Sequence, residues 1–162
     1  MRMQKVRLRA CALIIENDDI LLIEFKNDHD DGVHYNLPAG GLEPGETLTE
    51  AAQREAREEA CVEVEAGPVA FVYEYQPTKN ECIYGDIHSI GITFECKLKP
   101  GSYPKLPEKP DANQIGVKWI PISQLHTIKL YPEINQDIVK YHNGEPYRNY
   151  VEEHVIQLSK SQ

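Results

Sequence analysis

Three glutamates stand close together in the segment "REAREEA", which runs from Arg54 to Ala60. Alanine, glutamate and arginine are strong helix formers, so this segment is predicted to be helical. In a helix, Glu55 and Glu59 lie one turn apart on the same side, where two negative charges repel each other by roughly 0.2–0.5 kcal/mol. A helix selected for stability alone would carry a lysine at one of these positions. The repulsion indicates that the pair has a chemical role.

Helical periodicity places this pair on the apolar side of its helix. At roughly 100° per residue, the apolar residues share one side, namely Leu48, Ala51, Ala52 and Ala56. The polar side chains are predicted on the opposite side, namely Glu50, Gln53, Arg54 and Arg57. Glu58 flanks the pair, and no cation of the helix is expected to face Glu55 and Glu59. A solvated surface helix is the common alternative, but it would leave both glutamates in water. Buried carboxylates need a partner, and Mg²⁺, which prefers oxygen ligands, is the simplest one.

The segment "LPAGGLEPGE" directly precedes this helix and is rich in glycine and proline. Gly40 and Gly41 allow the main chain to approach a ligand closely. Thr47 followed by Glu50 matches a capping box, which marks the start of the helix. Anions are favoured at a helix N-terminus. A Gly-Gly pair alone would indicate only a turn, but its position before an acidic helix favours a site for an anionic ligand.

Hydrophobic patterning predicts the elements that position these groups. Strands are predicted over residues 8–15, 20–25, 68–77, 88–98 and 116–122. Helices are predicted over residues 47–61, 123–125 and 132–144, the last with Pro132 in its first turn and Gly144 as its stop. Loops are predicted over residues 26–36, 37–46 and 99–114, and residues 145–162 show no assignable pattern. This mixed order of strands and helices predicts an α/β or α+β fold around a sheet.

Length, charge and cysteine spacing limit the class of protein. A chain of 162 residues predicts one domain over residues 1–162. The formal net charge of −9 argues against a surface for DNA or RNA. The four cysteines contain no C-x-x-C pair, which favours free thiols in a reducing compartment. No stretch approaches the ~20 apolar residues of a membrane span, and the apolar run near the N-terminus is short for a signal peptide. A cytoplasmic protein without a membrane partner is therefore expected.

Residues Gly40–Val62 resemble the Nudix box, G-x5-E-x7-R-E-U-x-E-E-x-G-U, in which U is an aliphatic residue. The chain matches its fixed positions with Gly40, Glu46, Arg54, Glu55, Glu58, Glu59 and Val62. Two positions depart from the pattern. Ala56 stands where a larger aliphatic residue is usual, and Cys61 replaces the box glycine. A glycine there would adopt the left-handed cap conformation, so this helix is predicted to end by another geometry.

The resemblance implies a Nudix hydrolase with an α/β/α sandwich around a mixed central β-sheet. Such an enzyme hydrolyses a diphosphate linked to another group, usually in a nucleoside diphosphate derivative. Glu55 and Glu59 are then the principal Mg²⁺ or Mn²⁺ ligands, and Glu58 is a further ligand or the base that orients water. The main-chain carbonyl around Ala39–Gly40 is another candidate ligand. Neighbouring carboxylates are expected to raise one another's pKa until metal binds, so activity should rise towards alkaline pH.

The same resemblance assigns supporting roles. Arg54 and Glu46 are predicted to fix the loop against the helix, and both are included in the predicted catalytic set. Some members carry a further catalytic glutamate three residues before the tryptophan of the last core strand, where this chain has Gly116. Substitutes for that glutamate are sought among Glu95, Glu108 and Asp111.

The substrate is less constrained by the sequence. Pro77 lies close to the position of a proline in the ADP-ribose subgroup, and Tyr75, with Tyr73 and Phe71, offers an aromatic surface. Gly40, Gly41, Lys26, Arg7 and Arg9 are candidates for contact with substrate. These features favour ADP-ribose or nucleotide-sugar substrates. Two alternative functions stay open, namely a sanitising hydrolase for oxidised or non-standard nucleoside triphosphates and a non-catalytic nucleotide-binding domain. The oligomeric state also stays open, with a homodimer as one alternative.

Overall fold

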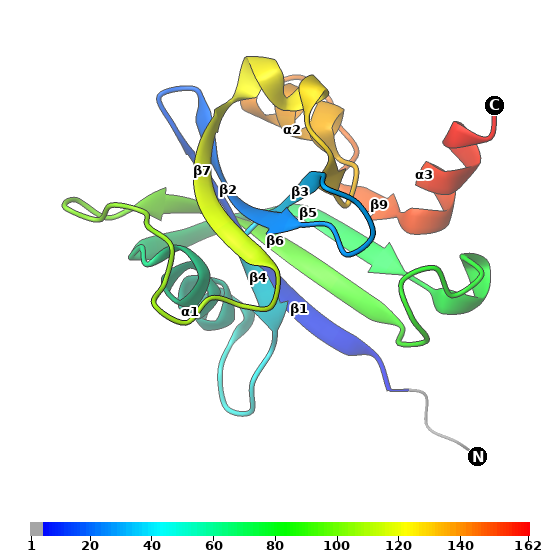
Figure 1. Cartoon of the computed structure of the whole chain (residues 1–162), viewed down its shortest axis with the longest axis horizontal. Coiled ribbons are helices and arrows are strands. Elements are labelled where there is room, and N and C mark those ends of the chain that lie inside the picture. The colour runs from blue at the N-terminus through cyan, green and yellow to red at the C-terminus, as the bar shows by residue number, and fades with distance from the viewer. Residues whose placement is uncertain (1–4) are drawn as a thin grey trace.

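A curved, mixed β-sheet forms the centre of the computed structural model, which describes residues 5–162 (Figure 1). Its strands are β1 (Arg7–Glu16), β2 (Asp19–Lys26), β3 (Val33–Asn36), β4 (Ala39–Gly41), β5 (Val64–Tyr75), β6 (Ser89–Leu98), β7 (Gln114–Pro121), β8 (Leu130–Tyr131) and β9 (Tyr150–Glu152). The α-helices are α1 (Leu48–Ala60), α2 (Asn135–His142) and α3 (Glu153–Lys160), and the 3₁₀ helices are η1 (Pro77–Lys79) and η2 (Ile122–Thr127). Across residues 5–162, every helix lacks the length and apolar character needed to cross a lipid bilayer.

The strand order of the sheet is β8-β3-β2-β1-β6-β5-β9, while β4 pairs with β1 and β7 pairs with β2. The pairs β1–β6, β3–β8 and β5–β9 are parallel, and the other pairs are antiparallel. The β4 pairing is the important one for the site, because it holds Gly40 opposite Ala10 and Gly41 opposite Arg9. The segment that leads into α1 is thereby attached to a central strand.

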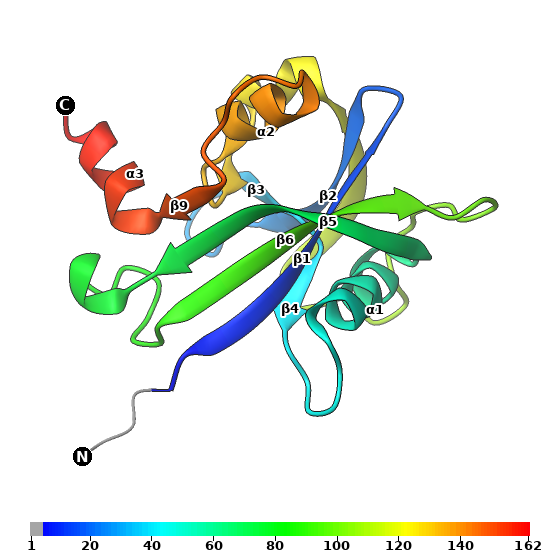
Figure 2. The same cartoon turned by 180° about the vertical axis from the view of Figure 1, so that it is seen from behind.

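Helices cover both faces of the sheet, α1 on one side and α2 and α3 on the other (Figures 1 and 2). Alternate residues of β1 follow this division, since successive side chains of a strand point to opposite faces. Ala10, Ala12 and Ile14 belong to the core beneath α1, whereas Leu13 belongs to the core beneath α2. The predicted α/β/α sandwich with a mixed central sheet is therefore confirmed.

Short strands account for the main errors in the predicted elements. Residues 26–36 and 37–46 were predicted to be loops, but they contain β3 and β4. These strands lack an apolar alternation and gain their structure from pairing with β2, β8 and β1. Strand β5 begins at Val64, four residues before the predicted start. Gly67 and Pro68, which are unusual within a strand, lie inside β5 at an irregularity in its pairing with β6.

The C-terminal part of the chain also differs from the prediction. Helix α2 begins at Asn135, so Pro132 lies before the helix and not in its first turn. The following tail adds β9 to the edge of β5 and ends in α3. The buried carboxylate of Asp137 accepts hydrogen bonds from the guanidinium of Arg148, including Nη2–Oδ2 at 2.7 Å. This contact attaches the start of the tail to α2, although nothing local in the sequence indicated it.

The end of α1 contradicts the prediction made for Cys61. Cys61 adopts the left-handed conformation, with φ 58° and ψ 31°. Its N–H donates to the carbonyl of Arg57 at 3.0 Å, and the N–H of Val62 donates to Ala56 at 3.4 Å. The helix therefore ends with the cap that a glycine would form, but with a residue that carries a Cβ. A left-handed conformation costs a non-glycine residue about 1–2 kcal/mol.

Replacing Cys61 by glycine should therefore stabilise the protein. After allowance for the greater flexibility of glycine in the unfolded chain, we expect Cys61→Gly to raise the free energy of unfolding by about 0.5–1 kcal/mol. Urea denaturation would measure this difference. Cys61→Ala keeps the Cβ and serves as the matched control, so an equal gain in both variants would show that the backbone conformation is not the cause.

Candidate active site

A capping box fixes the start of α1 beside the glycine-rich loop. The side chain of Thr47 accepts a hydrogen bond from the N–H of Glu50 at 3.2 Å, and the Glu50 carboxylate accepts one from the N–H of Thr47 at 2.7 Å. Because β4 pairs with β1 and the capping box sets the first turn, the chain between Gly41 and Thr47 has both ends fixed. The loop therefore presents its main chain to the helix in one arrangement.

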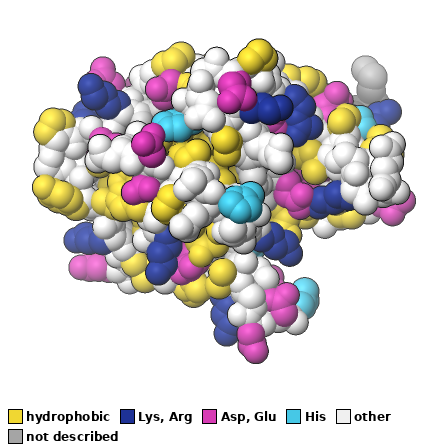
Figure 3. All heavy atoms as spheres, turned by 90° about the horizontal axis from the view of Figure 1, so that it is seen from above, with side chains coloured by type: hydrophobic (Ala, Val, Ile, Leu, Met, Phe, Trp, Pro, Cys, Tyr) yellow, Lys and Arg dark blue, Asp and Glu magenta, His cyan; other side chains and the backbone are white. Residues whose placement is uncertain are grey.

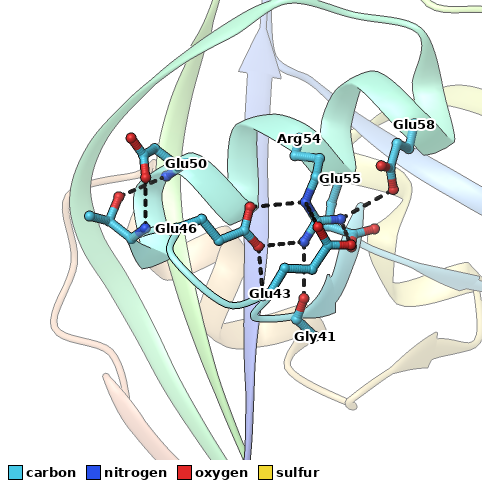
Figure 4. Close-up of polar contacts among 8 residues, drawn as sticks. Gly41, Glu43, Glu46, Glu50, Arg54, Glu55 and Glu58 are labelled. Carbon is cyan, nitrogen blue, oxygen red and sulfur yellow. Dashed lines mark hydrogen bonds and ion pairs between the residues drawn. The ribbon is translucent and has the colours of Figure 1, made fainter.

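Arg54 joins this loop to the glutamates of α1 (Figure 4). Its guanidinium donates to Glu46 through Nε at 3.0 Å and Nη2 at 2.7 Å, and Nη2 also donates to the carbonyl of Gly41 at 3.0 Å. From the other side of the guanidinium, Nη1 donates to Glu55 at 2.6 Å and to Glu58 at 3.2 Å. The expectation that no cation of the helix faces Glu55 was thus wrong. The long Arg54 side chain reaches around the helix, which angular positions alone do not reveal.

Glu55 and Glu59 lie buried on the face of α1 that packs against the sheet. Only 8% of Glu55 and 5% of Glu59 is exposed. They share this face with the buried residues Ala51, Ala52, Ala56 and Ala60. Oε1 of Glu59 accepts a hydrogen bond from the N–H of Ala39 in β4 at 2.7 Å. The helical periodicity therefore located both carboxylates correctly, whereas the side chain of Glu58 is half-exposed.

Burial changes the acidity of both carboxyl groups. It raises the pKa of Glu59 to about 8, an effect that the charge of Glu55 increases and the Ala39 N–H partly opposes. Burial also raises the pKa of Glu55, while the hydrogen bond from Arg54 acts in the opposite direction. The neighbouring charges contribute as the sequence predicted, but removal from water is the larger cause. When both carboxyl groups are ionised, the protein's own cations and hydrogen bonds therefore do not fully offset the cost of burying their charges.

The donor atoms of this pair suit a hard divalent cation. Carboxylate oxygens are the ligands that Mg²⁺ prefers. The main chain of Gly40 lies directly against Glu55, because a Cβ at position 40 would come within 2.0 Å of Oε1 of Glu55. Within residues 5–162, no group of three or more His, Cys, Asp or Glu side chains has its members close enough together to hold a metal ion. Glu58, predicted as a further ligand or as the base that orients water, pairs with Arg54 at 3.2 Å, and Glu55 pairs with the same guanidinium at 2.6 Å.

The three candidates for a further acidic group lie in different places. The charge of Asp111 raises the pKa of both Glu55 and Glu59, so this residue acts on the pair. Glu95 accepts a hydrogen bond from Tyr141 of α2, on the opposite face of the sheet. Glu108 is exposed. At Gly116, a Cβ would lie 2.8 Å from Oε1 of Glu24, which leaves no room for a longer side chain there without movement of Glu24.

Gln114 is a residue of this region that the sequence analysis missed. It is buried, and its Nε2 donates to the main-chain carbonyl of Glu59 at 2.8 Å. The N–H of Gln114 donates to the carbonyl of Asp111 at 3.0 Å. Gln114 therefore attaches the proline-rich loop, including Asp111, to the end of α1. A single glutamine at the end of a loop gives no pattern from which this role could have been inferred.

A cavity of about 760 Å³ lies beside the loop before α1. Its lining includes Arg7, Arg9, Tyr73, Tyr75, Tyr84 and Tyr131. A Cβ at Gly41 would lie 3.3 Å from Nη2 of Arg7, so this lining residue contacts the loop directly. A smaller recess of about 70 Å³ shares Arg9 with the cavity and includes Ala39 in its lining. The recess therefore adjoins the cavity through shared lining residues, and its Ala39 donates the hydrogen bond to Glu59.

Two residues that line this recess each carry a buried polar atom without a hydrogen-bond partner among residues 5–162. The atoms are Nε of Arg9 and Oδ1 of Asn36, and both residues line the cavity and the recess. Unsatisfied buried polar atoms are costly and uncommon in folded proteins. Arg9 was among the predicted substrate contacts, whereas Asn36 was missed because it lies in the unpredicted strand β3.

The other predicted substrate residues are only partly brought together. Tyr75 lines the cavity but is just 3% exposed. Phe71 is buried in the core beneath α2, and Pro77 is buried at the start of η1. Lys26 is exposed and lies outside the cavity lining. A direct contact of these residues with substrate stays a prediction.

The raised pKa of Glu59 predicts how stability depends on pH. An unfolded glutamate titrates near 4.5 and the folded one near 8, so the folded state binds the proton more tightly. Stability of the metal-free protein should therefore fall as pH rises from about 5 to about 8. Glu59→Gln should remove most of this fall and be more stable than wild type at pH 8 by roughly 2–4 kcal/mol.

Thermal unfolding in EDTA at several pH values would measure this effect. Glu108→Gln alters an exposed glutamate and is the matched control, expected to behave like wild type. Parallel pH profiles for wild type and Glu59→Gln would contradict the assigned burial effect.

Comparison with known proteins identifies the family to which the chain is related. A model of the NUDIX domain matches residues 5–141. The 8-oxo-dGDP phosphatase NUDT18 of Homo sapiens is 31% identical over 129 residues, which make up 76% of this chain and 36% of that protein. The chain thus spans well under half the length of the curated relatives that it matches.

Solved structures agree with the fold. A NUDIX hydrolase from Nitrosomonas europaea superposes with a TM-score of 0.68 at 22% identity, covering 93% of this chain and 80% of that one. An ADP-ribose pyrophosphatase from Streptococcus suis 89-1591 superposes with a TM-score of 0.60 at 19% identity, covering 90% and 98% of the two chains. With the family model matching most of the sequence, the chain belongs to the Nudix hydrolase family.

Proposed function

We propose that this protein hydrolyses a diphosphate linkage in a nucleoside diphosphate or its derivative, with Mg²⁺ or Mn²⁺ as cofactor. The observation that carries the proposal is the buried pair Glu55 and Glu59. Glu55 lies against the main chain of Gly40, and Glu59 is hydrogen-bonded to Ala39, which lines the small recess that shares residues with the large cavity. Glu55 and Glu59 would hold the cation, with Glu58 and the main chain around Ala39–Gly40 as further candidate ligands. When bound, the cation neutralises charge on the diphosphate and activates water for attack.

The protein's own residues hold this arrangement in place. Arg54 fixes the orientation of Glu55 and attaches the loop through Glu46 and Gly41. The Ala39 N–H fixes one oxygen of Glu59. In this proposal Glu58, which is half-exposed and paired with Arg54, leaves Arg54 and accepts a proton from water. In this proposal Arg54 and Glu46 position the catalytic glutamates and do not themselves touch the reacting atoms.

The cavity supports a substrate that combines anionic and apolar parts. Arg7 and Arg9 supply positive charge beside the loop, and the tyrosines supply apolar surface. Asp28, Asp30 and Asp86 add negative charge to the lining. An oxidised purine nucleoside diphosphate is the first candidate, because the relative with 31% identity is an 8-oxo-dGDP phosphatase. ADP-ribose or a nucleotide sugar is the second candidate, because a cavity of about 760 Å³ has room for a second moiety beyond the nucleoside.

The remaining expectations agree with a small-molecule substrate. On the face shown in Figure 3, lysine and arginine side chains are scattered among acidic ones and form no continuous basic stripe. The four cysteines are free, in keeping with the reducing compartment that we propose. A cytoplasmic location and a homodimer are parts of the proposal that a fractionation and a mass measurement would test.

A hydrolysis panel tests the proposed function. The panel contains 8-oxo-dGDP, 8-oxo-dGTP, ADP-ribose and UDP-sugars, each with Mg²⁺ and with Mn²⁺, and products are identified by mass. We expect Glu55→Gln and Glu59→Gln to lower kcat by roughly 100-fold or more, because each removes a carboxylate ligand. Glu145→Gln, at an exposed glutamate that has no predicted role in the site, should keep wild-type activity. Absence of hydrolysis, with nucleotide affinity unchanged in Glu59→Gln, would favour a binding domain instead.

Gly40 offers a second test of the metal site. A Cβ at position 40 would collide with Oε1 of Glu55 at 2.0 Å, so Gly40→Ala must displace that carboxylate. We expect Gly40→Ala to raise the Mg²⁺ concentration for half-maximal activity by about tenfold or more. Gly41→Ala is the matched control, since its Cβ would meet only the flexible end of Arg7 at 3.3 Å. Equal Mg²⁺ requirements in the two variants would argue against Glu55 as a ligand.

A further inference from the structure

The segment between β5 and β6, residues 76–88, forms one wall of the 760 Å³ cavity. Three large apolar side chains of this segment, Ile83, Tyr84 and Ile87, are about half-exposed, and all three line the cavity. Single exposed apolar residues are ordinary on protein surfaces. Three that line the same cavity instead provide a surface suited to the apolar part of a ligand.

Tyr84 lies at the centre of an aromatic array that crosses the cavity lining. Its ring is tilted against Tyr75 with centroids 5.7 Å apart, and it meets Tyr131 of β8 edge-to-face at 6.0 Å. Tyr131 in turn meets the ring of His34 edge-to-face at 5.3 Å. Aromatic side chains bind nucleobases by stacking whatever the base, because every base has a π-face. Among these rings, all of which belong to residues that line the cavity, Tyr84 is the most exposed to solvent.

The hydroxyl of Tyr75 holds the main chain on both sides of this ring. It donates to the carbonyl of Gly85 at 2.7 Å and accepts from the N–H of Tyr84 at 3.1 Å. Nearby, Glu81 and Cys82 have positive φ angles of 51° and 55°. Such conformations persist in non-glycine residues only when the surroundings enforce them. The buried Tyr75 is therefore suited to fixing the segment rather than to touching a ligand.

Cationic groups line the same cavity and connect it to the catalytic loop. The N–H of Arg7 donates to the carbonyl of His88 at the end of the segment, at 2.8 Å. The guanidinium of Arg7 lies against Gly41. A ligand with an apolar planar group on Tyr84 and an anionic group beside Arg7 would therefore extend towards Glu55. A nucleobase joined to a diphosphate has this arrangement of chemistry.

We propose that Tyr84 stacks on the nucleobase of the substrate and that Tyr75 is a positioning residue that holds Tyr84 in place. This inference rests on the proposed function for the nature of the substrate. It assigns discrimination between base-bearing and base-free diphosphates to the segment 76–88. The Nudix-box residues would then bind either kind of diphosphate through its phosphates.

Kinetics with three variants test this inference. With 8-oxo-dGDP and ADP-ribose as substrates, Tyr84→Ala should raise KM about tenfold and leave kcat within about twofold. Tyr84→Phe keeps the ring and should stay within about twofold of wild type in KM. Tyr75→Phe removes only the hydroxyl and should raise KM about threefold to tenfold. Tyr103→Ala, an exposed tyrosine outside the cavity, is the matched control.

A base-free competitor separates stacking from a general structural effect. Imidodiphosphate contains the phosphates without a base, so its inhibition constant should be the same in wild type and all variants. A parallel loss of imidodiphosphate affinity in Tyr84→Ala would overturn the inference, and so would an unchanged KM. If wild type were a dimer and Tyr84→Ala a monomer in sedimentation experiments, the wall would be a subunit contact, and the inference would also fail.

Binding measurements distinguish failure of this inference from failure of the proposed function. Calorimetric titration of metal-free protein with 8-oxo-dGDP and ADP-ribose should show about tenfold weaker binding for Tyr84→Ala than for wild type. If wild type bound these nucleotides about tenfold more tightly than Tyr84→Ala but hydrolysed none of them, the proposed function would fail and the role of Tyr84 would stand. If wild type hydrolysed them and Tyr84→Ala bound them equally well, only the role of Tyr84 would fail.

Discussion

Two carboxylates buried one helical turn apart are the constraint on which the rest of the site depends. Glu55 and Glu59 occupy the side of α1 that packs against the sheet, where ionised groups are costly without partners. Arg54 compensates Glu55, and the N–H of Ala39 compensates Glu59. The raised pKa of both groups shows that this compensation is incomplete. A divalent cation would complete it, which links the stability of the folded chain to the proposed chemistry.

The features that the sequence predicted well are those set by local periodicity. The capping box at Thr47 and the position of Glu55 and Glu59 on the apolar face follow from spacing within one helix. Strand β3 and the tail elements were missed because pairing with distant strands forms them. Cys61 was predicted wrongly because the helix end imposed a left-handed conformation that the residue itself disfavours. The contact between Arg54 and Glu55 was also missed, because helical angles give the direction of a side chain but not how far a long side chain can reach.

Under the proposed function, the fold separates the residues for the chemistry from those for substrate selection. Helix α1 and strand β4 hold the glutamates and the glycine-rich loop, which are the residues shared with the family motif. The cavity beside them is formed by parts outside that motif, including β1, β3, β8 and the segment 76–88. Loops on a rigid scaffold commonly carry such specificity. Membership of the family therefore defines the reaction class more closely than it defines the substrate, for which Asn36, Arg9 and Tyr84 are the residues to examine.

The proposed function requires the buried pair Glu55 and Glu59 to bind a divalent cation. Titration of the metal-free protein with Mn²⁺, followed by electron paramagnetic resonance of the free ion, tests it most directly. A cation site at this pair would give saturable binding to wild type at pH 8, weakened about tenfold or more in Glu59→Gln and in Glu55→Gln, and unchanged in Glu145→Gln. Equal Mn²⁺ affinity in wild type and in both glutamine variants would contradict it.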